Sequence, residues 1–327
     1  MTDKIRWGIL GTGSIAKKFA EGLKNLPDAQ LVAVGSRSLD SARTFADAFN
    51  VPHAHPTYES LAHDPDIDVV YIGTLNHLHA DNALLCLDAG KAVLCEKPFA
   101  LNAGETRRVV DVARARKLFL MEAMWTRYLP VVVKFRELIA EGAIGEPRVL
   151  FADFGFPNKP DPAHRLFNLS VGGGALLDVG VYPISLSSMV FGQPAQITGV
   201  AQIGPTGVDE QFSCILDGNA GQLSVLTASI RTRTPMEATL AGSDGFLRLH
   251  YPFWRPSRMT LTRPGKPDEL FDLPFLGNGY AHEAAEVGER LRAGALESSV
   301  MPLDETLTIM QTLDALRAQW GLRFPAE

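Results

Sequence analysis

Gly11-Thr12-Gly13-Ser14-Ile15-Ala16 is the stretch that decides the fold of the N-terminal half of the chain. It follows a short apolar run at Arg6–Leu10 and opens a helix-like stretch at Ser14–Leu26. In this strand–turn–helix context a G-x-G-x-x-G/A pattern binds the pyrophosphate of a dinucleotide, whereas the same glycines elsewhere indicate only a tight turn. The sequence therefore predicts a dinucleotide site near the start of the chain.

Each small residue of this turn has its own structural role. Gly11 permits the tight turn, Gly13 lets a pyrophosphate approach the backbone, and Ala16 lets the helix pack on the strand. The amides at the helix N-terminus then bind phosphate oxygens. The residues expected to hold the cofactor in this turn are Gly11, Thr12, Gly13, Ser14 and Ile15.

The rest of the N-terminal half alternates apolar runs with helix-like stretches, which is typical of βαβ units and a parallel sheet buried on both faces. Further strands are predicted at Leu31–Gly35, Val69–Thr74, Ala92–Cys95 and Leu118–Met121. Further helices are predicted at Asp40–Phe49, Ala80–Ala89 and Ala103–Arg116. We therefore predict an α/β, doubly wound Rossmann domain over residues 1–122.

The C-terminal half has a different texture, which predicts an α+β domain over residues 123–327 with a large, mainly antiparallel sheet. Strands are predicted at Val149–Phe156, Phe212–Leu216, Gln222–Ile230, Glu237–Ala241, Phe246–His250 and Met259–Thr262. Turn residues at 217–219 and 244–245 separate consecutive strands, as hairpins require. Helices are predicted at Val131–Ala140, Gly173–Phe191, Ala281–Arg292 and Leu303–Trp320, and a C-terminal helix is expected to pack back on the first domain.

Composition narrows the class of protein. At 327 residues the chain is long for a single core, which favours two domains. A net charge of −6 without long runs of like charge gives no sign of a basic surface that would bind nucleic acid or an anionic membrane. Because no stretch approaches about 18 consecutive apolar residues and Met1–Arg6 leads directly into a strand, we expect a cytoplasmic protein without a signal sequence or membrane span.

Three cysteines, Cys86, Cys95 and Cys214, are widely spaced and form no CxxC pair. They are expected to be reduced, buried thiols, the alternative being a catalytic thiol.

The residue after the second predicted strand selects between NAD and NADP, because an acidic residue there binds the ribose 2′-hydroxyl and repels a 2′-phosphate. Here the strand ends in Val34-Gly35-Ser36-Arg37. Ser36 can donate a hydrogen bond, and Arg37 offers a planar fork suited to phosphate. We therefore expect NADP rather than NAD, the alternative being that Arg37 is a solvated surface cation.

Two later strands end in polar residues at the same carboxyl edge, where ligands bind in such sheets. Lys97 should project toward the nicotinamide, and Pro98 should restrict Lys97 to extended conformations. The alternative is that Lys97 is an ordinary surface charge. Besides Lys97, the residues of this edge expected near the cofactor are Thr74, Leu75, Asn76, His79 and Glu96.

These motifs together resemble the glucose–fructose oxidoreductase and inositol dehydrogenase (Gfo/Idh/MocA) family over essentially the whole chain. The matching residues are Gly11-x-Gly13-x-x-Ala16, Asn76-x-x-His79, Glu96-Lys97-Pro98 and Gly172-Gly173-Gly174-x-x-x-Asp178-x-Gly180-x-Tyr182. Many members have histidine at the last of these positions. Tyr182, together with residues 121–127, resembles the subgroup that contains dihydrodiol and aldose dehydrogenases.

The resemblance implies that Lys97 and Tyr182 are the catalytic pair and that Asp178 holds substrate or orients that pair. Oxidising an alcohol removes the hydroxyl proton while hydride passes to the nicotinamide. A free tyrosine, with a pKa near 10, is a poor base at neutral pH, and an adjacent ammonium would lower that pKa. The alternative is that Tyr182 is a buried structural residue. Asp178 and Tyr182 should share a helix face, and Pro183 should kink or restart the helix just after them.

The resemblance also implies the substrate class, namely a small aldose, polyol or cyclic trans-dihydrodiol. Candidates for its pocket are Trp125, Phe154 and Trp254 as an apolar wall, with Arg127, Arg165 and Tyr280 as polar additions. For each aromatic residue, core packing is an equal alternative. A second function also stays open, that of an NADP(H)-binding sensor without catalysis.

Two further expectations concern metals and partners. His53 and His55 form one close pair and His77 and His79 another, but neither has a third ligand at motif spacing, so no metal site is expected. In the family reading His53 and His55 are loop residues. An exposed face of the C-terminal sheet is expected to form a homodimer or homotetramer, although the apolar parity of Gln222–Ile230 does not say which face is buried.

Overall fold

The computed structural model describes residues 4–325 and 327. The chain divides into two compact units. The first unit comprises Met1–Ala100, Gly104–Trp125 and Leu276–Thr306, and the second unit comprises Leu101–Ala103, Thr126–Phe275 and Leu307–Glu327. Each unit therefore contains residues from distant parts of the sequence.

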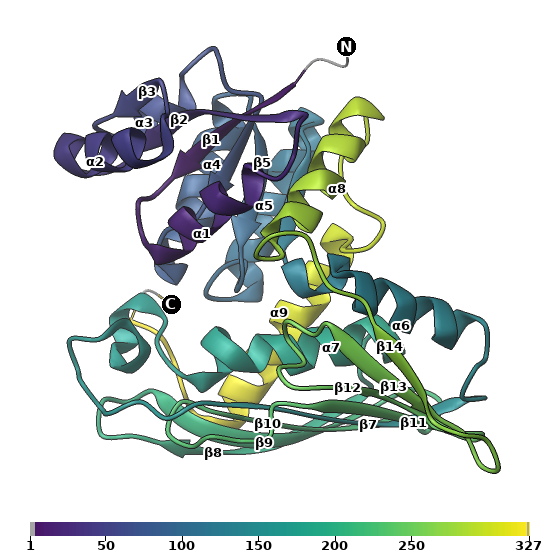
Figure 1. Ribbon diagram of the computed structural model, residues 1–327. Coiled ribbons are helices and arrows are strands. Elements are labelled where there is room, and N and C mark those ends of the chain that lie inside the picture. Colours follow the sequence, from purple (N-terminus) through teal and green to yellow (C-terminus); the bar gives the residue numbers. More distant parts are fainter. Residues whose placement is uncertain (1–3, 326) are drawn as a thin grey trace. The chain divides into compact units, whose positions relative to one another are not determined.

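The first unit contains a parallel sheet of six strands whose order reverses between β1 and β4. In spatial order the strands are β3 (His53–His55), β2 (Ala29–Gly35), β1 (Ile5–Leu10), β4 (Val69–Ile72), β5 (Ala92–Glu96) and β6 (Leu120–Ala123). Helices flank this sheet (Figure 1): α1 (Ser14–Leu23), α2 (Leu39–Phe49), α3 (Tyr58–Ala62), α4 (His79–Asp88), α5 (Ala103–Arg116) and α8 (Tyr280–Arg292). The reversal creates the crevice at the carboxyl ends of the strands where such folds bind ligands.

The central strands are apolar because both faces of the sheet are covered. Every residue of β4 is fully buried, and β5 and β6 are buried throughout. On one face Phe19 of α1 stacks on Tyr71 of β4, with ring centroids 3.7 Å apart, and its edge contacts Trp7 of β1. The predicted doubly wound fold is confirmed, and the predicted elements agree to within a few residues at their ends.

Two short elements escaped the sequence analysis. The strand β3 consists of His-Ala-His and lies at the edge of the sheet, so it has no apolar run to mark it. The helix α3 has five residues and begins at a capping box made by Thr57 and Ser60. The expectation that His53 and His55 are loop residues was therefore wrong, because both pair in register with β2.

The second unit contains a sheet of eight strands in which β7 and β10 pair in parallel and the other neighbouring strands described here pair antiparallel. In spatial order the strands are β14 (Glu269–Asp272), β13 (Arg258–Thr262), β12 (Phe246–Leu249), β11 (Ala238–Gly242), β7 (Pro147–Gly155), β10 (Leu223–Ser229), β9 (Asp209–Asp217) and β8 (Gln196–Ile203). The predicted, mainly antiparallel sheet is confirmed. The two edge strands, β8 and β14, were missed by the sequence analysis because they are largely exposed and weakly apolar.

Helices cover one face of this sheet and leave the other face open (Figure 1). The covering helices are α6 (Pro130–Ala140), α7 (Val181–Phe191) and the part of α9 (Leu303–Trp320) that belongs to this unit. In β10, Ser224, Leu226 and Ala228 are buried while Val225 is half-exposed. The structure thus settles the parity that the sequence left open, since period-two alternation puts these residues on opposite faces.

The helical segment Leu169–Phe191, which ends in α7, runs through the interior of this unit. Among the residues described, it is long and apolar enough to cross a membrane by length and composition alone. Yet 83% of its most apolar window is buried inside the fold. It is therefore a core helix, and its apolar character reflects packing.

From Pro183 we expected this helix to kink or restart just after Tyr182. The irregularity instead lies before Tyr182. Residues Leu176–Gly180 form a π-helical turn, and α7 begins directly at Val181. Pro183, the third residue of α7, lies inside this continuous helical run and has no amide hydrogen to donate to the preceding turn. The remaining short helices are 3-10 turns at Asn76–Leu78, Trp125–Tyr128, Arg165–Phe167 and Leu169–Val171.

Candidate functional site

The glycine-rich turn between β1 and α1 has the geometry of a phosphate cradle. Gly11 has φ +110°, and a Cβ there would lie 2.8 Å from the carbonyl oxygen of Gly73, so only glycine fits. A Cβ on Gly13 would meet no atom within 4 Å, which shows open space in front of the first turn of α1. No side chain caps this helix N-terminus, and its first turn holds no acidic residue. These residues therefore fit the pyrophosphate of a dinucleotide.

At the end of β2, Arg37 is exposed and lies between two aromatic partners. Burial raises the pKa of Tyr58, and the guanidinium of Arg37, which hydrogen-bonds this phenol, opposes the rise. Burial also lowers the pKa of His77, and the charge of Arg37 lowers it further. The backbone amide of Ser36 donates to the carbonyl of His55 at 3.2 Å. Arg37 is thus held beside Tyr58 and His77, with its charge open to a phosphate.

The buried side chain of His79 links the loops that follow β4 and β5 at the carboxyl edge of the sheet. The side chain is 1% exposed, with Nδ1 2.8 Å from the carbonyl oxygen of Pro98 and Nε2 3.1 Å from that of Thr74. Burial lowers the pKa of His79 to about 4 despite these two acceptors. The side chain of Asn82 also donates to Thr74, at 3.1 Å. The structure therefore places His79 where it positions the loop of Thr74, Leu75 and Asn76.

This burial of His79 predicts a pH dependence of stability. The folded-state pKa of about 4 lies below the ordinary value of 6.5, so between these pH values the unfolded chain binds a proton that the folded chain lacks. Stability is present above pH 6.5 and is lost as the pH falls, by about 3 kcal/mol in all. Urea unfolding from pH 7 to pH 4 measures this, and His79→Gln should flatten the slope. Equal slopes for both proteins would contradict the assignment.

Glu96 and Lys97 follow β5 at the same edge. Glu96 is 4% exposed, accepts the hydroxyl of Tyr71 at 2.5 Å and accepts the backbone amide of Lys97 at 3.2 Å. The carboxylate of Glu96 thus fixes the backbone from which the half-buried side chain of Lys97 departs. Burial raises the pKa of Glu96, and the hydrogen bond from Tyr71 opposes that rise.

A second buried acid lies close to this group. Glu283 of α8 is 0% exposed, and burial, followed by the charge of Glu96, raises the pKa of Glu283 well above its ordinary value. Burial also raises the pKa of Tyr71 well above its usual range, and the charge of Glu96 adds to that effect. Tyr71, Glu96 and Glu283 therefore form a buried acidic cluster at the end of β5, in which burial and the neighbouring charge favour the protonated form of Glu283.

In the second unit, Tyr182 lies in an aromatic cluster. Its ring centroid is 5.5 Å from that of Phe154 and 6.2 Å from that of Trp254. Phe154 and Trp254 stack on each other at 5.4 Å with an angle of 4°. Tyr182 is 8% exposed. The structure thus brings two residues of the predicted apolar wall to the predicted acid–base residue, although 154, 182 and 254 are far apart in the sequence.

A charged pair lies on the preceding turn. Nη1 of Arg165 is 2.6 Å from Oδ1 of Asp178, and the side chain of Arg165 is 47% exposed whereas that of Asp178 is 10% exposed. Arg127, in contrast, is 2% exposed, and its guanidinium donates to the hydroxyl and carbonyl of Ser185 on α7. Arg165 therefore keeps an open guanidinium, while Arg127 supports α7.

Trp125 and Tyr280 lie together in the first unit. Their rings stack with centroids 4.3 Å apart at 14°, and they are 2% and 7% exposed. This stacking agrees with the core-packing alternative for both residues.

The remaining predictions concern thiols and metals. All three cysteines are free and buried, as predicted, and burial raises the pKa of Cys86 and of Cys214 to about 12. Neither histidine pair has a third ligand at motif spacing, but the fold brings Asp64, which follows α3, beside both His53 and His55. Asp64 is 11 residues after His53 and 9 after His55, which is outside any familiar motif, so spacing alone could not reveal it.

Sequence reasoning also missed other residues of these sites. They are Tyr58 beside Arg37, Tyr71 and Glu283 beside Glu96, and Phe156 and Phe253 beside Phe154. Except for Phe156, which directly follows the strand of Phe154, each comes from a different part of the fold from its partner, so only tertiary structure assembles them.

Comparison with known proteins agrees with this architecture. Residues 5–124 match the family model described as "Oxidoreductase family, NAD-binding Rossmann fold", and residues 132–248 match the "GFO/IDH/MocA C-terminal domain". The chain belongs to the Gfo/Idh/MocA family. As a member it is a dehydrogenase or reductase that uses a nicotinamide cofactor, and both predictions are confirmed.

Individual relatives place the chain within the Gfo/Idh/MocA family. It is 39% identical to trans-1,2-dihydrobenzene-1,2-diol dehydrogenase of Mus musculus, over 99% of each chain. Among solved structures, the 3-ketoreductase KijD10 from Actinomadura kijaniata, in complex with NADP and TDP-benzene, is 28% identical with a TM-score of 0.87 over 97% of this chain and 98% of that one. An aldose-aldose oxidoreductase from Caulobacter crescentus shares the fold, with a TM-score of 0.89 at 21% identity, over 97% and 98% of the two chains. The predicted resemblance to the dihydrodiol dehydrogenase subgroup is confirmed.

Proposed function

We propose that this protein transfers hydride between NADP(H) and a CH–OH or C=O group of a cyclic trans-dihydrodiol, a small aldose or a polyol. The observation that carries the proposal is the aromatic cluster around Tyr182, at the end of a family motif in a chain 39% identical to a dihydrodiol dehydrogenase over its full length. Flat aromatic faces bind the apolar faces of sugars and unsaturated rings. Phe154 and Trp254 are therefore the proposed wall of the substrate pocket.

The proposed chemistry uses Tyr182 as the acid–base residue and Lys97 as the group that lowers its pKa. The bound nicotinamide supplies or accepts the hydride. Tyr182 takes the hydroxyl proton during oxidation and returns it during reduction. Asp178 orients substrate hydroxyl groups together with the open guanidinium of Arg165. Glu96 supports Lys97 through its backbone amide.

The proposed preference for NADP rests on Ser36 and Arg37, because no carboxylate follows β2 to repel a 2′-phosphate. Arg37→Ala should raise the KM for NADP⁺ by about 10- to 100-fold, since a charge-assisted hydrogen bond contributes roughly 1.5–3 kcal/mol. The KM for NAD⁺ should stay within about twofold. Initial rates with both cofactors measure this. Arg43→Ala, which removes an exposed arginine of α2, is the matched control.

The function itself is tested by giving the purified protein NADP⁺ with a panel of trans-dihydrodiols, aldoses and polyols and following NADPH absorbance. Turnover of at least one of these classes is expected, and the reverse reaction should consume NADPH with the corresponding carbonyl compound. Tight NADPH binding without turnover on the whole panel would instead favour the sensor function and overturn the proposal.

We also propose that the protein works in the cytoplasm as a homodimer or homotetramer. Free, buried cysteines are typical of a reducing compartment. The open face of the second sheet carries apolar side chains on four adjacent strands, namely Phe151, Val200, Ile215, Leu223 and Val225, which are 37–72% exposed. A hollow of about 490 Å³ on this face is lined by Ser213, Thr227 and their neighbours. Such apolar patches usually mark association surfaces.

The association surface predicts the effect of a charge placed at its middle. Ile215→Lys should shift the protein toward monomer in size-exclusion chromatography with light scattering, because it buries an unpaired ammonium at the interface. Leu270→Lys, at the opposite edge of the sheet and 61% exposed, should leave the mass unchanged. A monomeric parent protein, or an unchanged mass for Ile215→Lys, would contradict the proposed surface.

A further inference from the structure

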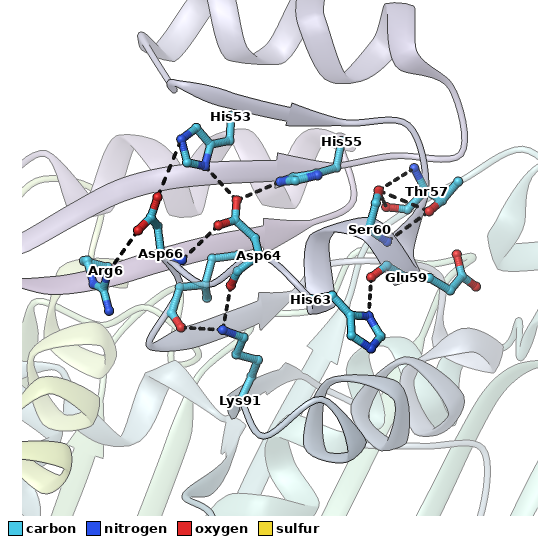
Figure 2. A network of polar contacts seen from close by, with 11 residues as sticks. Arg6, His53, His55, Thr57, Glu59, Ser60, His63, Asp64, Asp66 and Lys91 are labelled. Carbon is cyan, nitrogen blue, oxygen red and sulfur yellow. Dashed lines mark hydrogen bonds and ion pairs between the residues drawn. The ribbon is translucent and has the colours of Figure 1, made fainter.

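Two histidines and an aspartate meet at the edge strand of the first sheet (Figure 2). His53 and His55 are two apart on β3, so their side chains lie on one face of the strand. Oδ2 of Asp64 is 2.7 Å from Nδ1 of His53 and 2.8 Å from Nε2 of His55. One nitrogen of each ring and one carboxylate oxygen all lie within 4.8 Å of one another.

We propose that His53, His55 and Asp64 bind a divalent transition-metal ion of the zinc class. Two imidazoles and one carboxylate are a typical donor set for Zn²⁺ with a fourth position open to water. Imidazole ligands favour zinc, nickel and copper over magnesium and calcium, which prefer oxygen donors. The side chain of His53 is 38% exposed, which leaves a path to solvent for the ion and for a water ligand.

The carboxylate of Asp64 is held ready for this role. Its side chain is 3% exposed, and burial alone would raise its pKa. Hydrogen bonds from the amide of Asp66 and from both histidines outweigh burial and lower the pKa of Asp64 to about 2. These contacts hold Oδ2 of Asp64 between the two imidazole rings. Its other oxygen accepts the Asp66 amide at 2.9 Å, which fixes the direction of the carboxyl group.

The surrounding charges favour a cation. Asp64 and Asp66 lie near two cations, Arg6 and Lys91, in this corner of the unit (Figure 2), and Asp68 forms an ion pair with Arg6. Nζ of Lys91 donates to the backbone carbonyl of Asp64 at 2.6 Å, so its ammonium holds the turn without occupying the side-chain oxygens of Asp64. With neutral histidines, the local charge is therefore negative before an ion enters.

Binding needs a change of tautomer and a small spread of the ligands. Both rings now direct an N–H toward Asp64; on binding, the proton of His53 moves from Nδ1 to Nε2 and that of His55 from Nε2 to Nδ1, with no net proton released. Nε2 of His53 lies 3.9 Å from Oδ2 of Asp66. After the tautomer change, the N–H at Nε2 can donate a hydrogen bond to this carboxylate, which is the usual arrangement of a metal-binding histidine. Donor atoms around tetrahedral zinc lie about 3.3 Å apart, so each nitrogen must move from Asp64 by about half an ångström.

Calorimetric titration of the untagged, chelator-treated protein with ZnCl₂ at neutral pH tests the proposal. One equivalent should bind with micromolar or tighter affinity. His53→Gln and His55→Gln should each weaken binding by at least about 100-fold, while the glutamine amide still donates to Asp64 and preserves the fold. His63→Gln is the matched control, because His63 is exposed and its ring lies within hydrogen-bond distance of the carbonyl of Glu59.

A cobalt spectrum identifies the donors. Co²⁺ should give visible bands of a nitrogen and oxygen site without thiolate charge transfer, since the cysteines Cys86, Cys95 and Cys214 are buried elsewhere. Mg²⁺ should not compete. The proposal is overturned if Zn²⁺ does not bind up to about 1 mM, if both glutamine variants bind like the parent protein, or if thiolate bands appear.

Discussion

Replacing Tyr182 with phenylalanine should lower kcat by about 10²- to 10⁴-fold in both directions of the reaction, because the proton-transferring hydroxyl is lost. The ring of the new residue still packs against Phe154 and Trp254, so the fold and the aromatic wall should be preserved. NADPH affinity should stay within about twofold, since the change removes no proposed cofactor contact.

Steady-state kinetics over a range of pH and fluorescence titration with NADPH make this measurement. The parent enzyme should show a pH limb that the phenylalanine variant lacks. Tyr251→Phe, at a position 57% exposed, is the control for loss of a tyrosine hydroxyl as such. Unchanged turnover in Tyr182→Phe would remove the proposed acid–base role, and a loss caused only by weaker NADPH binding would do the same.

Replacing Gly13 with valine should weaken NADP(H) binding by about 100-fold or more while leaving the apo protein folded. Gly13 has φ −72° and ψ −179°, which any residue adopts, and its Cβ would meet no atom within 4 Å. The added methyl groups therefore enter the space in front of α1 that the pyrophosphate needs. Calorimetry of NADPH binding together with thermal unfolding separates the two effects.

The contrasting variant is Gly11→Ala. Its Cβ would lie 2.8 Å from the carbonyl of Gly73 in a left-handed backbone, so thermal stability should fall along with binding. A Gly13→Val protein that binds NADPH as tightly as the parent would show that the cofactor does not approach this turn. An unstable Gly13→Val protein would contradict the open space that the structure shows.

Periodicity predicted those parts of the fold that are long and regular. The helix α5 has fourteen residues, enough for helical spacing to be read, and was predicted at its observed bounds, whereas the short strand β4 was predicted from its unbroken apolar run. The strand β3 has three residues, two of them polar, so nothing in its composition separates it from a loop. The π-helical turn before Tyr182 was equally unreadable, since residue spacing does not distinguish it from an α-helical start.

Among the residues of the candidate site, too, some could be predicted from the sequence and others could not. Residues that act through the backbone, such as Gly11 and Gly13, could be predicted because local geometry requires glycine there. Arg127 shows the limit, because its charge suggested a substrate contact whereas the fold buries it against Ser185. Glu283 and Asp64 gave no signal at all, since their partners come from other elements and burial, which shifts the pKa of both, cannot be read from the sequence.

The path of the chain through the first unit has a consequence for how this unit matures. Residues 276–306 complete it: α8 brings Glu283 to Tyr71 and Glu96, and Asn278, which precedes α8, donates to the backbone carbonyl of Lys18. A gene fragment that stops before this segment encodes every glycine of the phosphate turn but lacks residues 276–306 of the first unit. On the ribosome, the first unit should therefore reach its final fold only after residues 276–306 have been synthesised, long after its glycine-rich turn has emerged.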